Sequence, residues 1–253
     1  MKQLEYLKIL SLSKRTLEEY LNWGETEIVK MPTDEIISTE ESVKMPSSKK
    51  QSGSVLSSKE KIKILKKTID SCKKCSLGSN RLNAVIGVGS PIADLMFVGE
   101  GPGFDEDHKG EPFVGKAGQL LTRIIEVMGY IRENVYITNV VKCHPMIDTT
   151  NPEKRSNDRP PSLLEMETCK YYLDKQIEII KPKIIVTLGA SSAKSLLHSE
   201  EPISKIRGII KEYKGIKLMP TYHPAALLRN PNLKKFVWDD MKIVMHYLDT
   251  EKI

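Results

Sequence analysis

Residues 94–103 have the sequence DLMFVGEGPG, in which a short apolar run leads directly into a glycine-rich loop. An apolar run of this length predicts a β-strand that is buried on both faces, as in a parallel sheet covered by helices. Three further runs of the same kind follow along the chain, at residues 135–141, 183–188 and 216–220. We therefore expect four buried strands in one sheet.

Helical patterns lie between and after these strands. Apolar residues recur at helical spacing in four stretches, which are residues 117–128, 163–180, 191–197 and 233–248. Strands that alternate with helices build parallel sheets through right-handed crossover connections. The sequence therefore predicts an α/β fold with three layers, α/β/α, around a central four-stranded parallel sheet.

Unusual residues follow each predicted strand. The first strand leads into Gly99–Gly103, the second ends around Asn139, the third enters Gly189–Ser191, and the fourth precedes Tyr222–Pro224. In an open parallel sheet, ligands bind outside the carboxyl ends of the strands. We expect these four segments to meet at one crevice.

The chain has 253 residues, of which 40% are hydrophobic and 28% charged, as in ordinary globular proteins. Residues 1–58 differ from the rest, because an apolar start is followed by a stretch rich in Ser, Thr, Lys and Glu. This pattern predicts an extension of short helices and a flexible linker before a compact domain at residues 59–253. Ser57 and Glu60 resemble a capping box at the start of that domain. No apolar run reaches membrane length, and no secretory signal is recognisable.

The formal net charge is +6, and it is unevenly distributed. Residues 1–58 carry a net charge of −1 and residues 59–253 a net charge of +7. A basic domain favours a polyanionic partner, although a solvated lysine-rich surface is the simpler explanation of the same numbers.

The chain has four cysteines, Cys72, Cys75, Cys143 and Cys169. Without a secretory signal they are expected to be reduced, which points to a metal centre or catalysis rather than disulfides. Cys72 and Cys75 form a chelating pair, and the other two would complete four ligands for zinc or for an iron–sulfur cluster. Zinc sites usually use two local pairs, whereas 25 residues separate the second pair here. That separation favours a cluster.

Three features suggest a binding site. Six of the fifteen glycines fall between Gly99 and Gly118, in a loop with neither the lysine of a phosphate-binding loop nor a dinucleotide-binding pattern. The Asn139 amide offers a donor and an acceptor, suited to one edge of a heterocycle, although a turn residue is the alternative. His223 at a strand end is a candidate hydrogen-bond donor or proton carrier, although a lone histidine is more often structural.

Taken together, the motifs resemble those of family 4 uracil-DNA glycosylases over about residues 60–253. The residues that carry the resemblance are Cys72-x2-Cys75, Gly99-Glu100-Gly101-Pro102-Gly103, Glu106-Asp107, Gly110-x-Pro112-Phe113-Val114-Gly115-x-Ala117-Gly118, Thr138-Asn139-Val140-Val141-Lys142-Cys143 and His223-Pro224-Ala225-Ala226-Leu227-Leu228-Arg229.

The resemblance implies an α/β/α domain of the uracil-DNA glycosylase type with a four-stranded parallel sheet. It also implies a [4Fe-4S] cluster, held here by Cys72, Cys75, Cys143 and Cys169. The implied activity is that of a monofunctional hydrolase in base excision repair, which flips deoxyuridine out of DNA, releases uracil and leaves an abasic site.

The same resemblance assigns roles in the pocket. Phe113 would stack on the base, the backbone of Glu100, Gly101 and Pro102 would meet its polar edge, and Asn139 would recognise O4 and N3–H. His223 would donate a hydrogen bond to O2 as the bond to the sugar breaks.

Further residues are candidates for positioning the water and for contacting DNA. The better known uracil glycosylases place an aspartate where this chain has Gly101, so Glu106 is the candidate that positions water, with Glu100 as the alternative. Lys142 is expected to contact DNA phosphates, and Leu228 and Arg229 to fill the gap left by the flipped nucleotide.

Two alternatives remain at this stage: a protein that sequesters uracil-containing DNA without turnover, and a zinc-bearing regulatory DNA-binding protein. The expected partner is uracil-containing DNA, single- or double-stranded, and the expected state is a monomer with no membrane association. The resemblance also implies a prokaryotic, cytoplasmic protein associated with the nucleoid. Residues 1–58 are a candidate contact for a replication or repair partner, although they contain no convincing recognition motif.

Overall fold

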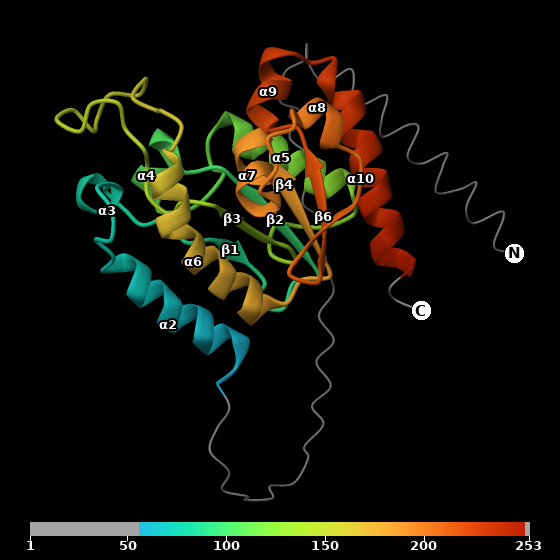
Figure 1. Cartoon of the computed structure of the whole chain (residues 1–253), viewed down its shortest axis with the longest axis horizontal. Coiled ribbons are helices and arrows are strands. Elements are labelled where there is room, and N and C mark those ends of the chain that lie inside the picture. The colour runs from blue at the N-terminus through green and yellow to red at the C-terminus, as the bar shows by residue number, and fades with distance from the viewer. Residues whose placement is uncertain (1–55, 251–253) are drawn as a thin grey trace, which may run out of the picture. The chain divides into compact units, whose positions relative to one another are not determined.

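A six-stranded sheet forms the centre of the structure, a computed structural model that describes residues 56–250 (Figure 1). The strand order is β1-β3-β2-β4-β6-β5. The four middle strands are parallel to one another, which confirms the predicted parallel sheet. Their bounds are β3 (Tyr136–Asn139), β2 (Leu95–Gly99), β4 (Ile184–Leu188) and β6 (Ile216–Thr221).

Two short edge strands extend this sheet beyond the predicted four. Strand β1 (Val88–Gly89) pairs antiparallel with β3, and β5 (Lys211–Tyr213) pairs antiparallel with β6. Strands β5 and β6 are joined by Lys214 and Gly215, which both have positive φ, as two-residue hairpin turns require. The sheet is therefore mixed, with a parallel centre and antiparallel edges. Strands of two or three residues carry too short a pattern to be recognised in the sequence.

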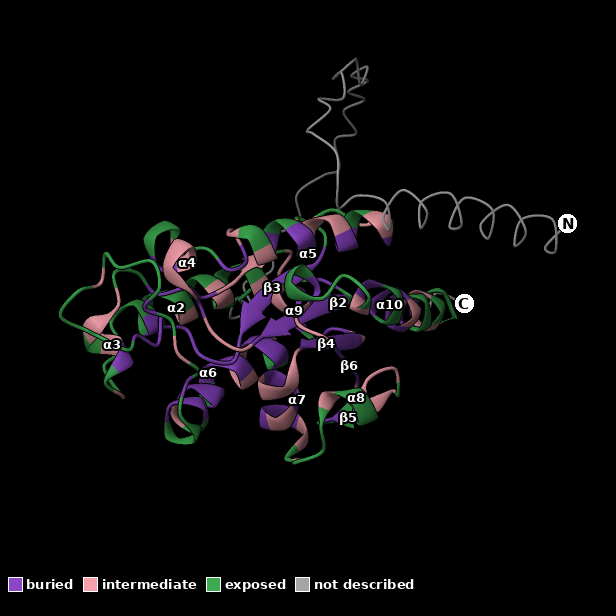
Figure 2. Ribbon diagram, turned by 90° about the horizontal axis from the view of Figure 1, so that it is seen from above, coloured by how far each residue is buried: buried purple, intermediate pink, exposed green. Residues whose placement is uncertain are grey.

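Helices cover both faces of the sheet, as a three-layer fold requires (Figure 2). Helix α5 (Lys116–Val127) lies on one face, and α6 (Leu163–Ile180) and α7 (Ala190–Leu197) lie on the other. Helix α10 (Leu233–Thr250) packs against β6. These four helices lie within a few residues of the predicted helical stretches.

The remaining helices are mostly short. Helix α2 (Ser58–Asp70) packs along α6, and it begins with the predicted capping box, in which Ser57 and Glu60 exchange hydrogen bonds. Residues from Ser57 onward form one compact unit. The extension predicted for residues 1–58 lies almost entirely outside the described residues. The short helices are α3 (Leu77–Asn80), α4 (Phe104–Lys109), α8 (Ile203–Ile206) and α9 (Pro224–Arg229).

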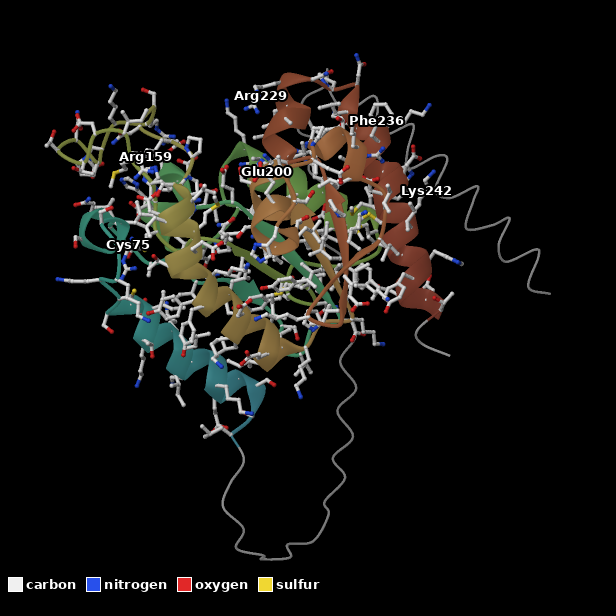
Figure 3. All side chains as sticks on the ribbon, in the orientation of Figure 1. Cys75, Arg159, Glu200, Arg229, Phe236 and Lys242 are labelled. Atoms are coloured by element: carbon white, nitrogen blue, oxygen red, sulfur yellow. The ribbon has the colours of Figure 1, made fainter. Side chains whose placement is uncertain are left out.

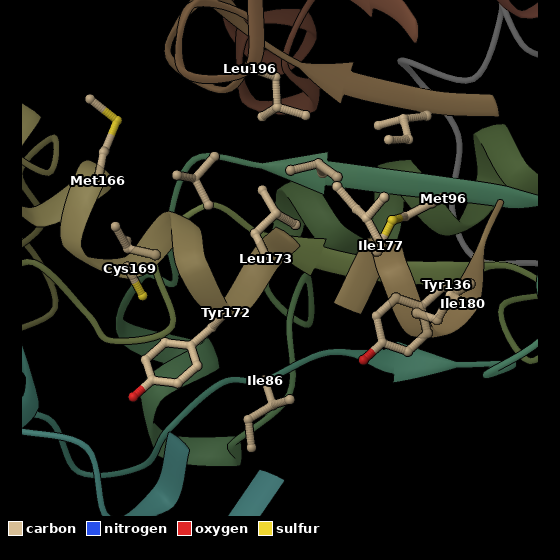
Figure 4. Close-up of a cluster of buried hydrophobic side chains, with 14 of the residues drawn as sticks. Ile86, Met96, Tyr136, Met166, Cys169, Tyr172, Leu173, Ile177, Ile180 and Leu196 are labelled. Carbon is tan, nitrogen blue, oxygen red and sulfur yellow. The ribbon is translucent and has the colours of Figure 1, made fainter. Parts of the chain in front are cut away.

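The core lies between the sheet and its helices. Every residue of β2, β3 and β4 is buried, and a layer of apolar side chains from α6 packs on the sheet (Figure 4). A buried polar cluster lies inside this layer: Gln176 donates hydrogen bonds to the carbonyl of Ile86 and to the Tyr136 hydroxyl, and Thr138 also donates to Ile86. Over residues 56–250, no helix is both long and apolar enough to cross a membrane.

Candidate active site

A cleft of about 460 Å³ lies where the parallel strands end. This volume is in the range of pockets that enclose a small ligand. The segments after β2, β3, β4 and β6 all contribute to its wall, so the four segments predicted to meet do meet. The structure brings together Glu100, Gly101, Pro102, Glu106, Phe113, Asn139, His223 and Arg229, each of which had been singled out as a site residue.

Asn139 is placed by the register of the sheet. It is the last residue of β3 and pairs with Gly99, the last residue of β2. Its side chain is buried, and its Oδ1 has no hydrogen-bond partner within the described part of the chain. A Cβ at position 99 would lie 2.3 Å from this oxygen, so only glycine leaves the amide its space. A buried carbonyl without a partner is costly, and a ligand that donates a hydrogen bond would satisfy it.

Phe113 lies beside Asn139 in a conformation that is unusual for a bulky residue. Its φ is 54°, in the left-handed region, and its ring lies 5.7 Å from the imidazole of His223, centroid to centroid. A Cβ at position 118 would lie 1.9 Å from the Phe113 backbone, so Gly118 permits this close packing. Backbone in this region persists only where its surroundings hold it. The ring is therefore a fixed platform in the cleft wall.

The carboxylate of Glu106 contributes to that support. Its Oε1 accepts hydrogen bonds from the backbone N–H groups of Val114 and Gly115, at 2.9 and 3.0 Å, and its Oε2 accepts from Gly103 at 3.2 Å. Glu106 thus ties helix α4 to the loop that follows Phe113. Because both oxygens already bind backbone donors, the geometry favours a positioning role over the predicted activation of water.

His223 is held at the start of α9, directly after β6. Its Nδ1 accepts a hydrogen bond from the backbone N–H of Ala225 at 3.1 Å, which leaves the proton on Nε2. Burial, and secondarily the positive charge of Arg229, lower the pKa of His223 to about 4. The imidazole is therefore neutral at physiological pH, with one N–H available for donation.

The residues expected to contact DNA fall into two groups. Arg229 lines the cleft, and Leu228 on the same helix is about half exposed, at 49%. Lys142, in contrast, is completely buried, and its ammonium donates to Thr138 Oγ1 and to the carbonyl of Asn139. The prediction that Lys142 contacts DNA phosphates is therefore wrong, because no phosphate reaches a side chain inside the core.

The sequence analysis missed one wall of the cleft. Residues 158–161 line the cleft together with residues of α9, and they belong to a polar insertion, residues 151–161, that precedes α6. Figure 3 shows Arg159 and Arg229 toward the same end of the molecule. Arg159 donates two hydrogen bonds to Glu165 and thereby fixes the insertion to α6. The insertion carries no apolar pattern or motif, so only its place between Cys143 and Cys169 hinted at this role.

A buried histidine anchors the same insertion. His144 Nε2 lies 2.6 Å from Asp158 Oδ1, and its Nδ1 lies 3.5 Å from Asp107 Oδ2. Burial acts to lower the pKa of His144, but the two carboxylates raise it to about 9. Protonated His144 thus links α4 to the loop that carries Asp158.

The four cysteines line one cavity, away from the cleft. Cys72 and Cys75 lie between α2 and α3, Cys143 follows β3, and Cys169 leaves α6 on the same face as Tyr172 (Figure 4). Within residues 56–250, no three His, Cys, Asp or Glu side chains come close enough to share a single metal ion. A four-iron cluster binds each cysteine to a different iron, so its ligands stand further apart than those of one ion. The donor set of four cysteines in one cavity therefore fits a cluster better than a zinc ion.

Arg81 is a residue of this cavity that the sequence analysis did not identify. Its Nη1 donates to the sulfur of Cys143 at 2.8 Å, and its Nη2 donates to the carbonyls of Ile69 and Asp70 at the end of α2. Burial raises the pKa of the Cys143 thiol to about 12.

Comparison with known proteins relates this arrangement to one family. A family model described as the uracil DNA glycosylase superfamily matches residues 86–242. A type-4 uracil-DNA glycosylase from Sulfurisphaera tokodaii is 47% identical over 204 residues, covering 76% of this chain and 87% of the relative. Proteins of the same name from Archaeoglobus fulgidus and Thermotoga maritima are 41% and 40% identical, covering 72% and 76% of this chain and 91% and 97% of the relatives.

Proposed function

Because this chain belongs to the type-4 uracil-DNA glycosylases, we propose that it hydrolyses the N-glycosidic bond of deoxyuridine in DNA. The reaction releases uracil and leaves an abasic site, which makes this a hydrolase of base excision repair. The observation that carries the proposal is the unpartnered, buried Oδ1 of Asn139, next to the ring of Phe113 and in the same cleft as His223. The substrate is uracil-containing DNA, single- or double-stranded.

Selection of uracil follows from the Asn139 amide. Its Oδ1 would accept from N3–H of uracil, and its Nδ2 would donate to O4. Cytosine carries an acceptor and a donor in the reverse order, so it would leave both amide groups unpaired. Sites built to satisfy one hydrogen-bond pattern reject the wrong one by factors on the order of 10⁴. The fixed amide therefore accounts for the rejection of the normal base from which uracil arises by deamination.

The N-glycosidic bond becomes accessible only when the deoxyuridine is flipped out of the stacked bases of the DNA, which costs a few kcal/mol. Stacking on the Phe113 ring would recover part of this cost, and the backbone of Glu100, Gly101 and Pro102 would meet the polar edge of the base. Leu228, exposed beside the cleft residue Arg229, would occupy the gap left in the duplex together with Arg229.

Bond cleavage leaves negative charge on the uracil and positive charge on the sugar. The neutral His223 would donate its Nε2–H to O2 of the uracil as the negative charge grows. A donor that is already oriented stabilises the transition state without reorganisation. Glu100 and Glu106 both line the cleft, but both carboxylate oxygens of Glu106 are bound to backbone N–H groups, so Glu100 is the better candidate to position the water.

Cys72, Cys75, Cys143 and Cys169 would hold a [4Fe-4S] cluster. Its contribution when bound would be architectural, because it would join three separate segments of the chain at one point. Cys143 lies four residues after Asn139, so its ligation would also fix the end of the strand that presents the amide. Supports of this kind hold reactive groups in productive geometry.

The test is incubation of the purified protein with a labelled oligonucleotide that contains one deoxyuridine, followed by hot alkali to cut any abasic site. A thymine-bearing oligonucleotide is the control. Cleavage only at the uracil supports a monofunctional glycosylase. Tight binding to the uracil oligonucleotide without release of free uracil would favour sequestration instead. Zinc rather than iron and sulfide in the purified protein would favour the regulatory alternative.

The remaining expectations follow from the same proposal. We propose that the protein acts as a monomer in a prokaryotic cytoplasm, on the DNA of the nucleoid. A contact between residues 1–58 and a replication or repair partner stays a prediction, because those residues lie almost entirely outside the described part of the chain. Size-exclusion chromatography with light scattering would test the monomer.

A further inference from the structure

Two cationic side chains line the cavity of the four cysteines without a carboxylate partner. They are Arg81 and Lys142. Among the ion pairs formed by the described residues, none includes either of them, and their hydrogen bonds go to carbonyls, one hydroxyl and one sulfur. A buried cation that has no anionic partner costs several kcal/mol. Lys142 is completely buried and Arg81 is half-buried, so an anion inside the cavity would stabilise both, and Lys142 most strongly.

The Lys142 side chain also contacts the end of β3, which borders the candidate active-site cleft. Its Nζ donates to the carbonyl of Asn139 at 2.5 Å and to the hydroxyl of Thr138 at 2.7 Å. These are the last two residues of β3, and Asn139 is the residue whose amide faces the cleft. One buried side chain thus lines the cysteine cavity and holds the backbone of the base-recognising residue.

A cluster bound by four thiolates carries net negative charge, and charges interact strongly where water is excluded. Resting on the proposed function, we propose that Lys142 is a positioning residue that couples the cluster to uracil recognition. Its charge balances the thiolate-bound cluster, and its two hydrogen bonds fix the end of β3 that presents Asn139. The cluster orients the ammonium, and the ammonium orients the strand end.

Two other cations line the same cavity, Arg81 and Lys74, but neither is bonded to the strand end as Lys142 is. Arg81 shares the cavity, but its other bonds go to the end of α2, away from the cleft. Lys74 also lines the cavity, yet its side chain is exposed and its ammonium lies over the rings of Tyr171 and Tyr172. Lys74→Met is therefore a matched control, since it removes the same charge from the same cavity where solvent screens it.

Two substitutions separate the charge of Lys142 from its hydrogen bonds. Lys142→Met removes both, whereas Lys142→Gln removes the charge and keeps N–H donors near Asn139. The first measurement is the reduction potential of the cluster, without substrate. We expect a more negative potential in both variants, because a nearby positive charge favours the reduced, more negative cluster. Lys74→Met should shift the potential less. Equal shifts in the Lys142 and Lys74 variants, or no shift, would overturn the charge-balance claim.

The second measurement is uracil excision, as kcat/KM. We expect Lys142→Met to lose about 10- to 100-fold, as is typical when a group that orients a site is removed. Lys142→Gln should lose less, because it can still bind the Asn139 carbonyl. Equal excision by wild type and Lys142→Met would overturn the link to recognition. If the Lys142 variants lose iron while Lys74→Met retains it, and circular dichroism shows all of them folded, the charge-balance claim is supported.

The experiments distinguish a failure of the Lys142 inference from a failure of the proposed glycosylase function. A wild-type protein that binds a cluster but releases no uracil would contradict the glycosylase assignment, while the potentials would still test the charge of Lys142. An active wild type with indistinguishable variants would contradict this inference alone.

Discussion

The neutral imidazole of His223 gives the sharpest test of the proposed chemistry. Because Nδ1 accepts from Ala225, only Nε2–H is available to a leaving group, and loss of one such oriented donor typically lowers the rate by about 10²–10³, or roughly 3–4 kcal/mol. His223→Ala should therefore lose excision on this scale in single-turnover assays with uracil-containing DNA. His223→Asn is the matched variant, since asparagine caps helices well but its side chain is shorter than the imidazole. We expect His223→Asn to keep the thermal stability of wild type and to lose excision as His223→Ala does.

The pH dependence of the wild type provides a second line of evidence. Burial and Arg229 lower the pKa of His223 to about 4, from an ordinary value of 6.5. Protonation of Nδ1 would break the hydrogen bond from Ala225, so the excision rate should stay level from pH 8 to about pH 5 and fall as the pH approaches 4. The same depressed pKa means that this group lowers the free energy of unfolding as the pH falls from 6.5 toward 4. An acid limb centred near pH 6.5, or His223→Ala within a few-fold of wild type, would refute the reasoning.

Three further changes test the supports of the site. Gly99→Ala would place a carbon 2.3 Å from the Asn139 amide oxygen, so uracil excision should fall at least tenfold, chiefly through KM, without loss of iron. Glu106→Gln keeps one acceptor but loses the negative charge that binds three backbone N–H groups. We expect lower thermal stability and a partial loss of kcat. Unchanged stability with an abolished kcat would instead indicate that Glu106 acts directly on the water. Arg159 lowers the pKa of Glu165 to about 2 from 4.5, so this ion pair stabilises the fold above pH 4.5 and that stability is lost between pH 4.5 and 2. Arg159→Met should remove roughly 2 kcal/mol at pH 6 and little at pH 2, measured by urea unfolding; an equal loss at both pH values would contradict the assignment.

The parallel centre of the sheet was predictable because its strands are buried on both faces and read as continuous apolar runs. Parallel strands have their carboxyl ends at the same edge of the sheet, so the pattern also predicts that Gly99, Asn139 and His223 meet at that edge. The edge strands β1 and β5 were not predictable, because two or three residues cannot show a period. The sequence could identify the four cysteines as ligands but could not show where they meet, since Cys169 lies on a helix 26 residues beyond Cys143.

Charged residues were the weakest part of the sequence-based prediction. A lysine in a basic chain is most simply placed on the surface, and the sequence around Lys142 contains nothing that distinguishes a buried ammonium from an exposed one. Its burial depends on the Thr138 hydroxyl and on a cysteine cavity that is assembled from distant parts of the chain. Glu106 shows the same limit, since the backbone donors that occupy its carboxylate come from a loop whose path follows from Gly118 and the left-handed Phe113.

One short segment, residues 138–143, connects the candidate active-site cleft with the cysteine cavity. Residues 138–143 begin at the strand end that faces the cleft and finish at a cysteine that faces the other cavity. A backbone segment this short transmits a displacement of one end to the other, because it has few dihedral angles in which to absorb it. The Lys142 side chain connects the same two places by a hydrogen bond, from the cysteine cavity to the Asn139 carbonyl. A covalent and a non-covalent connection thus run in parallel between the cysteine cavity and Asn139, so loss of the proposed cluster should displace the Asn139 amide before it disturbs the rest of the sheet.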